Sequence, residues 1–187
     1  MRKKEMDYFS ALYDVARVIN ASLDGSLVLE EIVRCVASAM RIKASSIRLV
    51  DTRQKRLVMG AAYGLSEKYL RKGPVLIEES GIDKNALNGK TFWLKDARTD
   101  KNFQYGDMAK AEGIKSVLVV PLLLESRVIG VLRVYSDEVR EFDFQEIRFL
   151  EAVANLSAIA LDNARMHQKL KTDCDLMAAH KYRIDDN

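Results

Sequence analysis

The segment from Lys115 to Ser136, KSVLVVPLLLESRVIGVLRVYS, constrains the fold of this chain more than any other stretch. It contains two apolar runs on either side of a polar tripeptide at 125–127, which is the pattern of two β-strands joined by a tight turn. The side chains of a strand alternate between two faces, so a hairpin this apolar needs other elements to cover it. The sequence therefore predicts a central sheet that is packed against helices.

Three amphipathic segments supply such helices. Apolar residues recur at helical spacing from Glu5 to Asn20, from Leu27 to Met40 and from Asp143 to at least Lys171. In the last segment, Asp143 and Glu146 form the D-x-x-E pattern that caps a first helical turn. The first and last segments are apolar on more than one side, whereas a sheet covers only one side of a helix. We therefore expect a twofold homodimer, and the alternative is that these helices pack only on one another in a monomer.

Further strands and an irregular excursion are expected between these helices. Residues from Ala44 to Asp51 alternate between the two faces of a strand, and Arg56 to Tyr63 forms an antiparallel partner strand. The stretch from Leu65 to Phe103 is the least regular, and long irregular connections in compact domains often carry binding sites. We also expect a helix at Gly81–Leu87, a strand at Thr91–Leu94 and a helix at Phe103–Glu112.

Charge and cysteine content argue against several classes of protein. The 187 residues include 30 basic and 27 acidic side chains interspersed along the chain, which is typical of a solvated surface and not of a nucleic-acid or membrane patch. Cys35 and Cys174 do not form a disulfide framework or a zinc motif. No run approaches the roughly 20 apolar residues that cross a bilayer. We expect a cytoplasmic protein with one domain and helical extensions, and with no nucleic-acid or membrane partner.

The order of these elements resembles the GAF domain family. The family has a strand that ends in aspartate, a glycine after the next strand, a glycine-led helix with a short strand, a proline-containing hairpin and a long closing helix. The strings similar to these features are SIRLVD at Ser46–Asp51, the glycine at Gly64, the stretch Ser80–Phe103, the hairpin at Gly113–Ser136 and the segment Arg140–Ala164. The resemblance covers residues 8 to 170.

The resemblance implies an α+β fold of the GAF type, which is related to the PAS fold. Its central antiparallel sheet has five or six strands, with the terminal helices on one face and short helices and loops over a pocket on the other. Residues 1–170 would form the GAF domain with its N- and C-terminal dimerisation helices, and residues 171–187 a helical extension or tail. Family members bind cyclic nucleotides, tetrapyrroles, haem or small organic acids, and fold alone does not choose among these ligands.

The residues disfavour several of the family's ligands. Members that bind cyclic nucleotides carry an asparagine-lysine pair where this chain has Ser136 and Asp137. Neither cysteine is expected beside the pocket, which disfavours a covalently attached bilin and the methionine sulfoxide reductase branch. The only histidines, His167 and His180, lie at or beyond the end of the last helix, which disfavours haem. No Ser-His-Asp, paired-carboxylate or phosphate-loop pattern appears, so we expect no enzyme and no cofactor.

Two arginines mark the expected pocket. Arg48 and Arg133 each lie in the middle of an apolar strand, and alternation points both away from the face that the long helices cover. Two guanidinium groups would suit a small organic anion such as a carboxylate or phosphate, although they would also pair with a carboxylate such as Asp51 or Glu112. The residues expected to bind ligand are Arg48, Tyr63, Ile82, Trp93, Phe103, Tyr105, Met108, Ser116, Leu118 and Arg133.

The sequence thus favours a non-enzymatic GAF domain that senses a small molecule or transduces a signal as a homodimer. A downstream signalling protein would receive the output. The alternative is a protein-interaction or dimerisation module whose pocket is filled by side chains and binds no ligand. The identity of the ligand and of the downstream partner is not encoded in any recognisable motif.

Overall fold

A six-stranded antiparallel sheet lies at the centre of the computed structural model, which describes residues 7–51, 53 and 55–185, with side chains up to residue 177. The helices are α1 (Tyr8–Ala21), α2 (Gly25–Met40), α3 (Glu67–Leu70), α4 (Gly81–Leu87), α5 (Gly106–Glu112) and α6 (Phe144–Asp185). The strands are β1 (Ala44–Asp51), β2 (Arg56–Tyr63), β3 (Val75–Leu76), β4 (Phe92–Leu94), β5 (Ser116–Leu124) and β6 (Arg127–Ser136). They are arranged in the order β3-β2-β1-β6-β5-β4.

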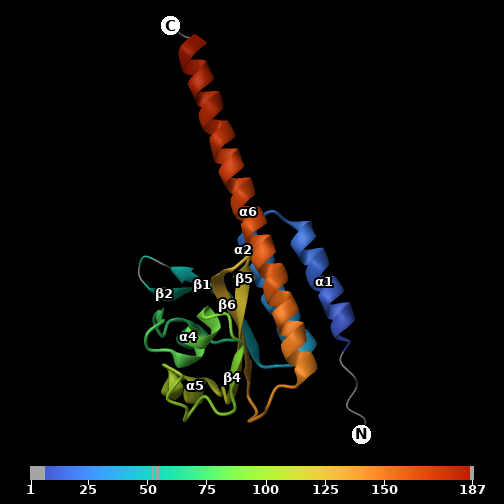
Figure 1. Cartoon of the computed structure of the whole chain (residues 1–187), viewed down its shortest axis with the longest axis vertical. Helices are drawn as coiled ribbons and strands as arrows, with labels where there is room; N and C mark the ends of the chain where they lie inside the picture. Colours follow the sequence, from blue (N-terminus) through green and yellow to red (C-terminus); the bar gives the residue numbers. More distant parts are fainter. Residues whose placement is uncertain (1–6, 52, 54, 186–187) are drawn as a thin grey trace.

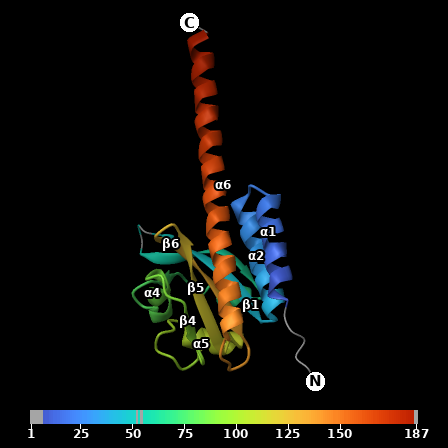
Figure 2. The ribbon, with the colours of Figure 1, turned by 45° about the vertical axis from the view of Figure 1, so that its right-hand side comes forward.

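The sheet separates two layers of helices. Figures 1 and 2 show α1, α2 and the first half of α6 on one side of the sheet, with α4 and α5 on the other side. The hairpin β5-β6 occupies the middle of the sheet, and β1 pairs with its second strand. This is the α+β architecture that the resemblance implied, with six strands, so the predicted fold class is confirmed.

Most predicted elements have the expected position. The first two residues of the helix expected from Glu5 lie outside the described residues, and the helix expected from Leu27 begins at Gly25. The other differences lie in the irregular excursion. The helix expected from Phe103 begins at Gly106, and Phe103 lies before it in a turn closed by the bond from its N–H to the Asp100 carbonyl. The strand expected from Thr91 begins at Phe92. The elements α3 and β3 were not predicted, since helices of four residues and strands of two are too short to show a period.

Side-chain caps fix where the long helices begin. The Asp24 side chain accepts hydrogen bonds from the backbone N–H groups of Ser26 and Leu27 at the start of α2. At the start of α6 the Asp143 N–H donates to Glu146 Oε2 and the Glu146 N–H donates to Asp143 Oδ1, both at 2.9 Å. This reciprocal pair is the capping box that the D-x-x-E pattern predicted, and such caps contribute about 1 kcal/mol each.

The alternation of the strands divides the interior into two cores. On the side of the long helices, Leu132 and Val134 of β6 pack with residues of α2 and α6. On the other side, Val131 and Tyr135 of the same strand pack with residues of α4 and α5. Polar side chains that are buried in the second core therefore lie under the short helices, and this is where Arg133 of β6 is placed.

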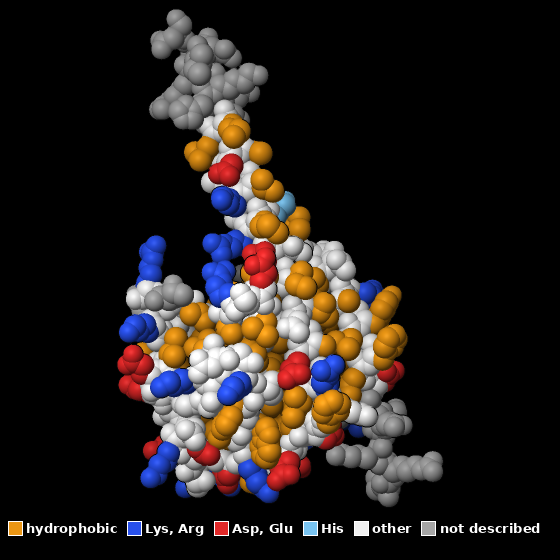
Figure 3. Space-filling view, viewed as in Figure 1, with side chains coloured by type: hydrophobic (Ala, Val, Ile, Leu, Met, Phe, Trp, Pro, Cys, Tyr) orange, Lys and Arg blue, Asp and Glu red, His pale blue; other side chains and the backbone are white. Residues whose placement is uncertain are grey.

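The last helix extends well beyond the body of the domain. α6 has 42 residues, and its second half stands clear of the sheet and of the other helices (Figure 1). Apolar side chains remain exposed along this extension, as the space-filling view shows (Figure 3). They include Met166, Leu170, Leu176 and Met177. Among the described residues, none of the helices is both long enough and apolar enough to span a membrane.

Candidate functional site

Arg133 is held by a buried carboxylate from the short-helix layer. It lies opposite Val119 of β5 and Ser46 of β1, and only 1% of it is exposed. Its Nε donates to Asp83 Oδ1 at 3.0 Å and its Nη2 donates to Asp83 Oδ2, while the Ser80 hydroxyl also donates to Asp83 Oδ2. Burial acts to lower the pKa of Arg133, but Asp83 more than offsets it and the pKa is raised. This pair therefore ties α4 to the sheet.

Arg48 lies on the same face and has no such partner. It is opposite Val131, two residues before Arg133 on β6, and 2% of it is exposed. Its Nε and Nη2 atoms are buried and make no hydrogen bond. Burial lowers the pKa of Arg48, and the positive charge of Arg133 lowers it further. A buried guanidinium with two nitrogens that make no hydrogen bond is costly.

Two more unsatisfied polar atoms belong to Tyr69 of α3 and to Lys72, just after that helix. The Tyr69 hydroxyl and the Lys72 Nζ are buried and lack a hydrogen-bond partner. The Lys72 Nζ lies 3.3 Å from the centre of the Tyr69 ring, 5.1 Å from that of Tyr105 and 5.9 Å from that of Phe103. Burial, followed by the charges of Arg133 and Arg48, lowers the pKa of Lys72 to about 6. This shift favours the uncharged amine over the ammonium form.

These five residues form one cationic cluster, which consists of Arg48, Tyr69, Lys72, Asp83 and Arg133. Lys72 lies over the Tyr69 ring, whose centre is 6.3 Å from that of Tyr135. Tyr135 shares a face of β6 with Arg133, and its hydroxyl lies 2.9 Å from Ser46 Oγ, two residues before Arg48 on the same face of β1. Among the described residues, the buried side-chain nitrogen and oxygen atoms that lack a hydrogen-bond partner all belong to three members of this cluster. The cluster holds two guanidinium groups and one carboxylate, so it has an excess of positive charge.

A hollow of about 340 Å³ opens beside Tyr69, and Met108, Ala111 and Glu112 of α5 form one of its walls. Ser66 and Lys68 also line it. Glu112 does not pair with either arginine of the cluster, because its carboxylate accepts hydrogen bonds from the backbone N–H and the hydroxyl of Ser66. The hollow therefore leads from the surface toward the ring of Tyr69.

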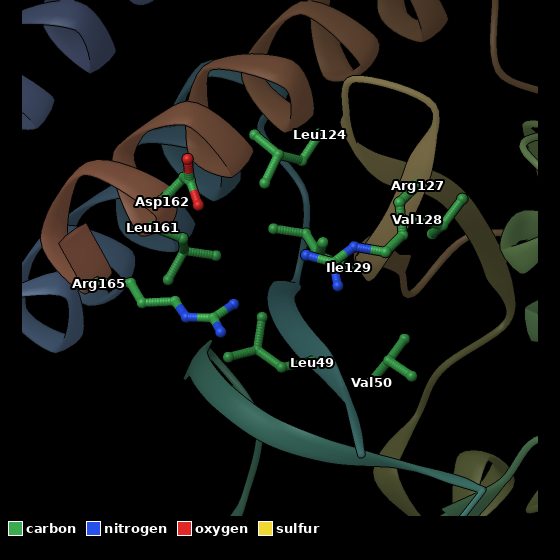
Figure 4. Close-up of a pocket in the computed structure, with 9 residues that line it drawn as sticks. All are labelled: Leu49, Val50, Leu124, Arg127, Val128, Ile129, Leu161, Asp162 and Arg165. Atoms are coloured by element: carbon green, nitrogen blue, oxygen red, sulfur yellow. The ribbon is translucent and has the colours of Figure 1, made fainter. Parts of the chain in front are cut away.

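A second concave surface lies between α6 and one end of the central strands β1, β5 and β6. This groove of about 370 Å³ has an apolar floor that includes Leu49, Ile129 and Leu161, and two arginines at its rim. Figure 4 shows Arg165 reaching from α6 toward Leu49, with Arg127 near Ile129. Because Leu49 and Ile129 pack with the long-helix core, the groove is separate from the cationic cluster.

The structure brings together six of the ten residues expected to bind ligand. The residues that share the short-helix side of the sheet are Arg48, Ile82, Phe103, Tyr105, Met108 and Arg133. Neither Asp51 nor Glu112 pairs with the arginines, as Asp51 pairs with Arg56. The faces predicted for Arg48 and Arg133 from strand alternation are therefore correct, whereas the carboxylates suggested as their partners are not.

Four residues of the expected set lie elsewhere. Leu118 and Trp93 pack in the core under the long helices, because the register pairs Leu118 with Val134 and Trp93 with Leu118. Paired residues in antiparallel strands share a face, so placing these two side chains in the pocket was wrong. Tyr63 is 43% exposed at the end of β2, and the Arg34 guanidinium of α2 lies 6.0 Å from its ring centre.

Ser116, the fourth of these, has a local structural role. Its Oγ lies 2.7 Å from the Lys95 carbonyl and 2.9 Å from the Glu138 carbonyl, and it accepts a hydrogen bond from the Arg140 N–H at 2.8 Å. These contacts use the single donor of the hydroxyl and one of its two acceptor positions. Ser116 therefore joins three backbone segments at the end of the sheet.

Sequence reasoning missed four residues of this face. Tyr135 could have been found, because it lies two positions after Arg133 and therefore on the same face of β6. Its hydroxyl lies 2.9 Å from Ser46 Oγ. The sequence feature that could have pointed to Asp83 was a single acidic residue next to Ile82 in a short helix. Tyr69 and Lys72 carry no periodic signal, since α3 is one turn long and Lys72 follows it in a turn.

The comparison with known families decides the identity of the fold. The sequence pattern that describes GAF domains matches residues 25–162. This chain belongs to the GAF domain family. GAF domains are typical of sensory and regulatory proteins, and over 177 residues this one is 24% identical to the formate hydrogenlyase transcriptional activator FhlA of Escherichia coli (strain K12). That alignment covers 89% of this chain and 25% of the activator, so the GAF chain spans about a quarter of the length of the curated relatives it matches.

Solved structures agree on the GAF fold. The GAF domain of a phosphoenolpyruvate-protein phosphotransferase from Coxiella burnetii superposes with a TM-score of 0.78 at 21% identity, covering 88% of this chain and 98% of that one. A free methionine-R-sulfoxide reductase from Neisseria meningitidis gives a TM-score of 0.72 at 21% identity, covering 86% and 91%. GAF relatives therefore include regulators and enzymes. In this chain Cys35 lies on α2, where burial raises the pKa of its thiol, and Cys174 is exposed on the extension of α6.

Proposed function

We propose that this GAF domain is a regulatory module that binds a small organic anion at Arg48. The observation that carries the proposal is the buried guanidinium of Arg48, which has two nitrogens without a hydrogen bond beside a second arginine that is already paired. A buried charge without compensation costs about 3–5 kcal/mol. An anionic ligand would remove that cost, and this gives the domain a physical reason to bind one.

The chemistry of Arg48 selects the class of ligand. The free Nε and Nη2 atoms lie on one edge of the guanidinium, and this fork of donors matches the two oxygens of a carboxylate or a phosphate. The Tyr69 hydroxyl supplies a further donor. We infer binding and not catalysis, because neither cysteine belongs to the cluster and both of its arginines are fixed in the middle of strands.

Binding at Arg48 would be transmitted through β1 to the long helices. Arg48 points to one face of β1, while its neighbours Ile47 and Leu49 point to the other and pack against the core formed with α2 and α6. A ligand that draws the Arg48 side chain toward it would shift the strand on which those residues lie. The output would then pass through α6 to a downstream signalling protein.

The long helices also support the homodimer. Phe9 and Tyr13 of α1 are 84% and 62% exposed. On α6 one stripe repeats at alternating intervals of three and four residues, and it consists of Leu156, Ile159, Asn163, Met166, Leu170, Asp173 and Met177. Such a heptad stripe is typical of two parallel helices, and a single asparagine within it fixes their register. A second copy of this chain is therefore the proposed partner for this face.

One observation favours the alternative of a dimerisation module without a ligand. Asp83 already occupies the space over Arg133, and the rings of Tyr69, Phe103 and Tyr105 surround Lys72. In that case the cluster would only hold the short helices on the sheet, and the helices alone would carry the function.

Isothermal titration distinguishes the two functions. Acetate, succinate and inorganic phosphate would be titrated into the wild type, Arg48→Gln and the control Arg127→Gln, whose guanidinium lies in the groove outside the cluster. We expect binding of at least one anion that Arg48→Gln weakens roughly 10- to 150-fold, the equivalent of one or two hydrogen bonds to a charged group. Arg133 is not used, because its removal would leave Asp83 unpaired. Equal affinity in wild type and Arg48→Gln would refute the anion site.

Native mass spectrometry on the same samples would report the oligomeric state and any ligand that is retained during purification. A dimer without any bound anion, combined with flat titrations, would favour the dimerisation module.

A further inference from the structure

Lys72 has the environment of a reactive amine. Its Nζ is buried, makes no hydrogen bond and is enclosed by aromatic rings. The charges that act on it are those of Arg133, Arg48, Asp83 and Glu112. Lysines are activated as nucleophiles when they are desolvated or placed beside another cation, because both effects favour the neutral amine with its free electron pair. Lys72 is both desolvated and influenced by the nearby charges of Arg133 and Arg48, and its pKa is lowered to about 6.

We propose that the Nζ amine of Lys72 reacts with carbon dioxide and that Arg48 holds the resulting carbamate. The inference rests on the proposed anion site at Arg48 and names the source of the anion. In the reaction the nitrogen electron pair forms a bond to the carbon of CO₂, and one carbon–oxygen π pair moves onto oxygen. The nitrogen then releases one proton to water. No oxidant or reductant is needed.

The carbamate would satisfy the polar atoms that the cluster leaves without partners. Its two oxygens can accept from Arg48 Nε and Nη2 and from the Tyr69 hydroxyl, and its nitrogen is the formerly unpartnered Nζ of Lys72. Charge also balances, since two guanidinium groups would then face the Asp83 carboxylate and the carbamate. A free carboxylate bound to Arg48 would supply the same negative charge. It would not form a bond to the Lys72 nitrogen.

The size and charge of CO₂ suit the access to this cluster. The hollow beside Tyr69 is lined by Met108 and Glu112, and the buried Nζ of Lys72 lies over the Tyr69 ring. An uncharged molecule of three atoms loses little hydration on entering such a site, whereas a carboxylate must be desolvated. The negative charge appears only after the carbon–nitrogen bond has formed, next to the groups that stabilise it.

Carbon-13 NMR provides the test. Wild type, Lys72→Met, Lys72→Arg, Arg48→Gln and the control Lys68→Arg would be equilibrated with ¹³C-labelled CO₂ and bicarbonate at pH 7.5, and any signal common to all variants, such as that of the α-amino group, would be subtracted. We expect a carbamate resonance in the wild type and in Lys68→Arg, none in either Lys72 variant, and at least a tenfold higher CO₂ requirement in Arg48→Gln. Trapping with a trialkyloxonium salt followed by peptide mass spectrometry would locate the adduct on Lys72. Circular dichroism would verify that each variant folds.

The outcomes separate this inference from the anion site on which it rests. No carbamate in the folded wild type, or a carbamate that persists in Lys72→Arg, would overturn the inference. The titrations with acetate, succinate and phosphate, repeated in CO₂-free buffer, test the anion site alone. If an anion binds through Arg48 while no carbamate forms, the anion site stands and the carbamate is refuted. If neither is found, both proposals fail, and a carbamate that acetate displaces would support both.

Discussion

Replacing Asp83 with asparagine tests the contact that joins the short helices to the sheet. Asp83 is fully buried, and it accepts hydrogen bonds from two nitrogens of Arg133 and from the Ser80 hydroxyl. Asparagine has the same shape but no charge, so the guanidinium of Arg133 would remain buried without a counter-ion. Breaking a buried pair in this way costs about 3–5 kcal/mol. For a chain of this size each kcal/mol lowers Tm by about 2–4 °C, so we expect a fall of about 6–20 °C.

Urea unfolding followed by circular dichroism at pH 7 would measure this loss at a fixed protein concentration, because the stability of the proposed dimer would depend on concentration. The matched control is Glu67→Gln, which breaks the exposed ion pair between Glu67 and Arg71. Exposed pairs contribute at most about 1 kcal/mol. The double variant Asp83→Leu with Arg133→Met should recover part of the loss, since a well-packed apolar pair often replaces a buried ion pair without cost. A loss for Asp83→Asn no larger than that for Glu67→Gln would refute this account of the cluster.

Three further predictions follow from residues described above. Because the pKa of Lys72 is about 6 in the folded chain and near 10.4 in the unfolded one, the unfolded state binds more protons between these values, so wild-type stability should rise relative to Lys72→Met between urea titrations at pH 6.5 and pH 9.5. Gly64→Ala should lower Tm by several degrees, since Gly64 has a φ of +75° and an added Cβ would lie 2.2 Å from the Lys43 carbonyl. Met166→Glu should weaken dimerisation at least roughly tenfold in sedimentation equilibrium without changing anion affinity, and an unchanged dimer would argue against the α6 stripe.

The sequence was most informative where a side chain's position depends on local periodicity. Alternation along β1 and β6 was enough to place Arg48 and Arg133 on the face away from the long helices. Leu118 of β5 pairs with Val134 of β6, and paired residues share a face of the sheet. The sequence prediction did not use this register and therefore placed Leu118 in the pocket. The helix caps were also predictable, because a cap involves residues only three positions apart.

The polar partners of the arginines could not be predicted in the same way. Asp83 and Arg133 are 50 residues apart, and their contact depends on how α4 is laid across the sheet. Lys72 acquires its properties from three rings and two guanidinium groups that come from separate segments. Its position in an irregular connection gave no sign of this environment. The fold thus followed from local pattern, whereas the chemistry of the cluster arises only from tertiary packing.

The continuity of α6 has a mechanical consequence. No glycine or proline occurs between Phe144 and Asp185, so the helix has no hinge between the core and its tip. The 19 residues beyond Met166 extend about 29 Å at 1.5 Å per residue. A tilt of about 5° at the base would therefore displace the tip by roughly 2.5 Å. Such a helix would act as a lever that enlarges, at its tip, a movement at its base too small to disturb the packing of the sheet.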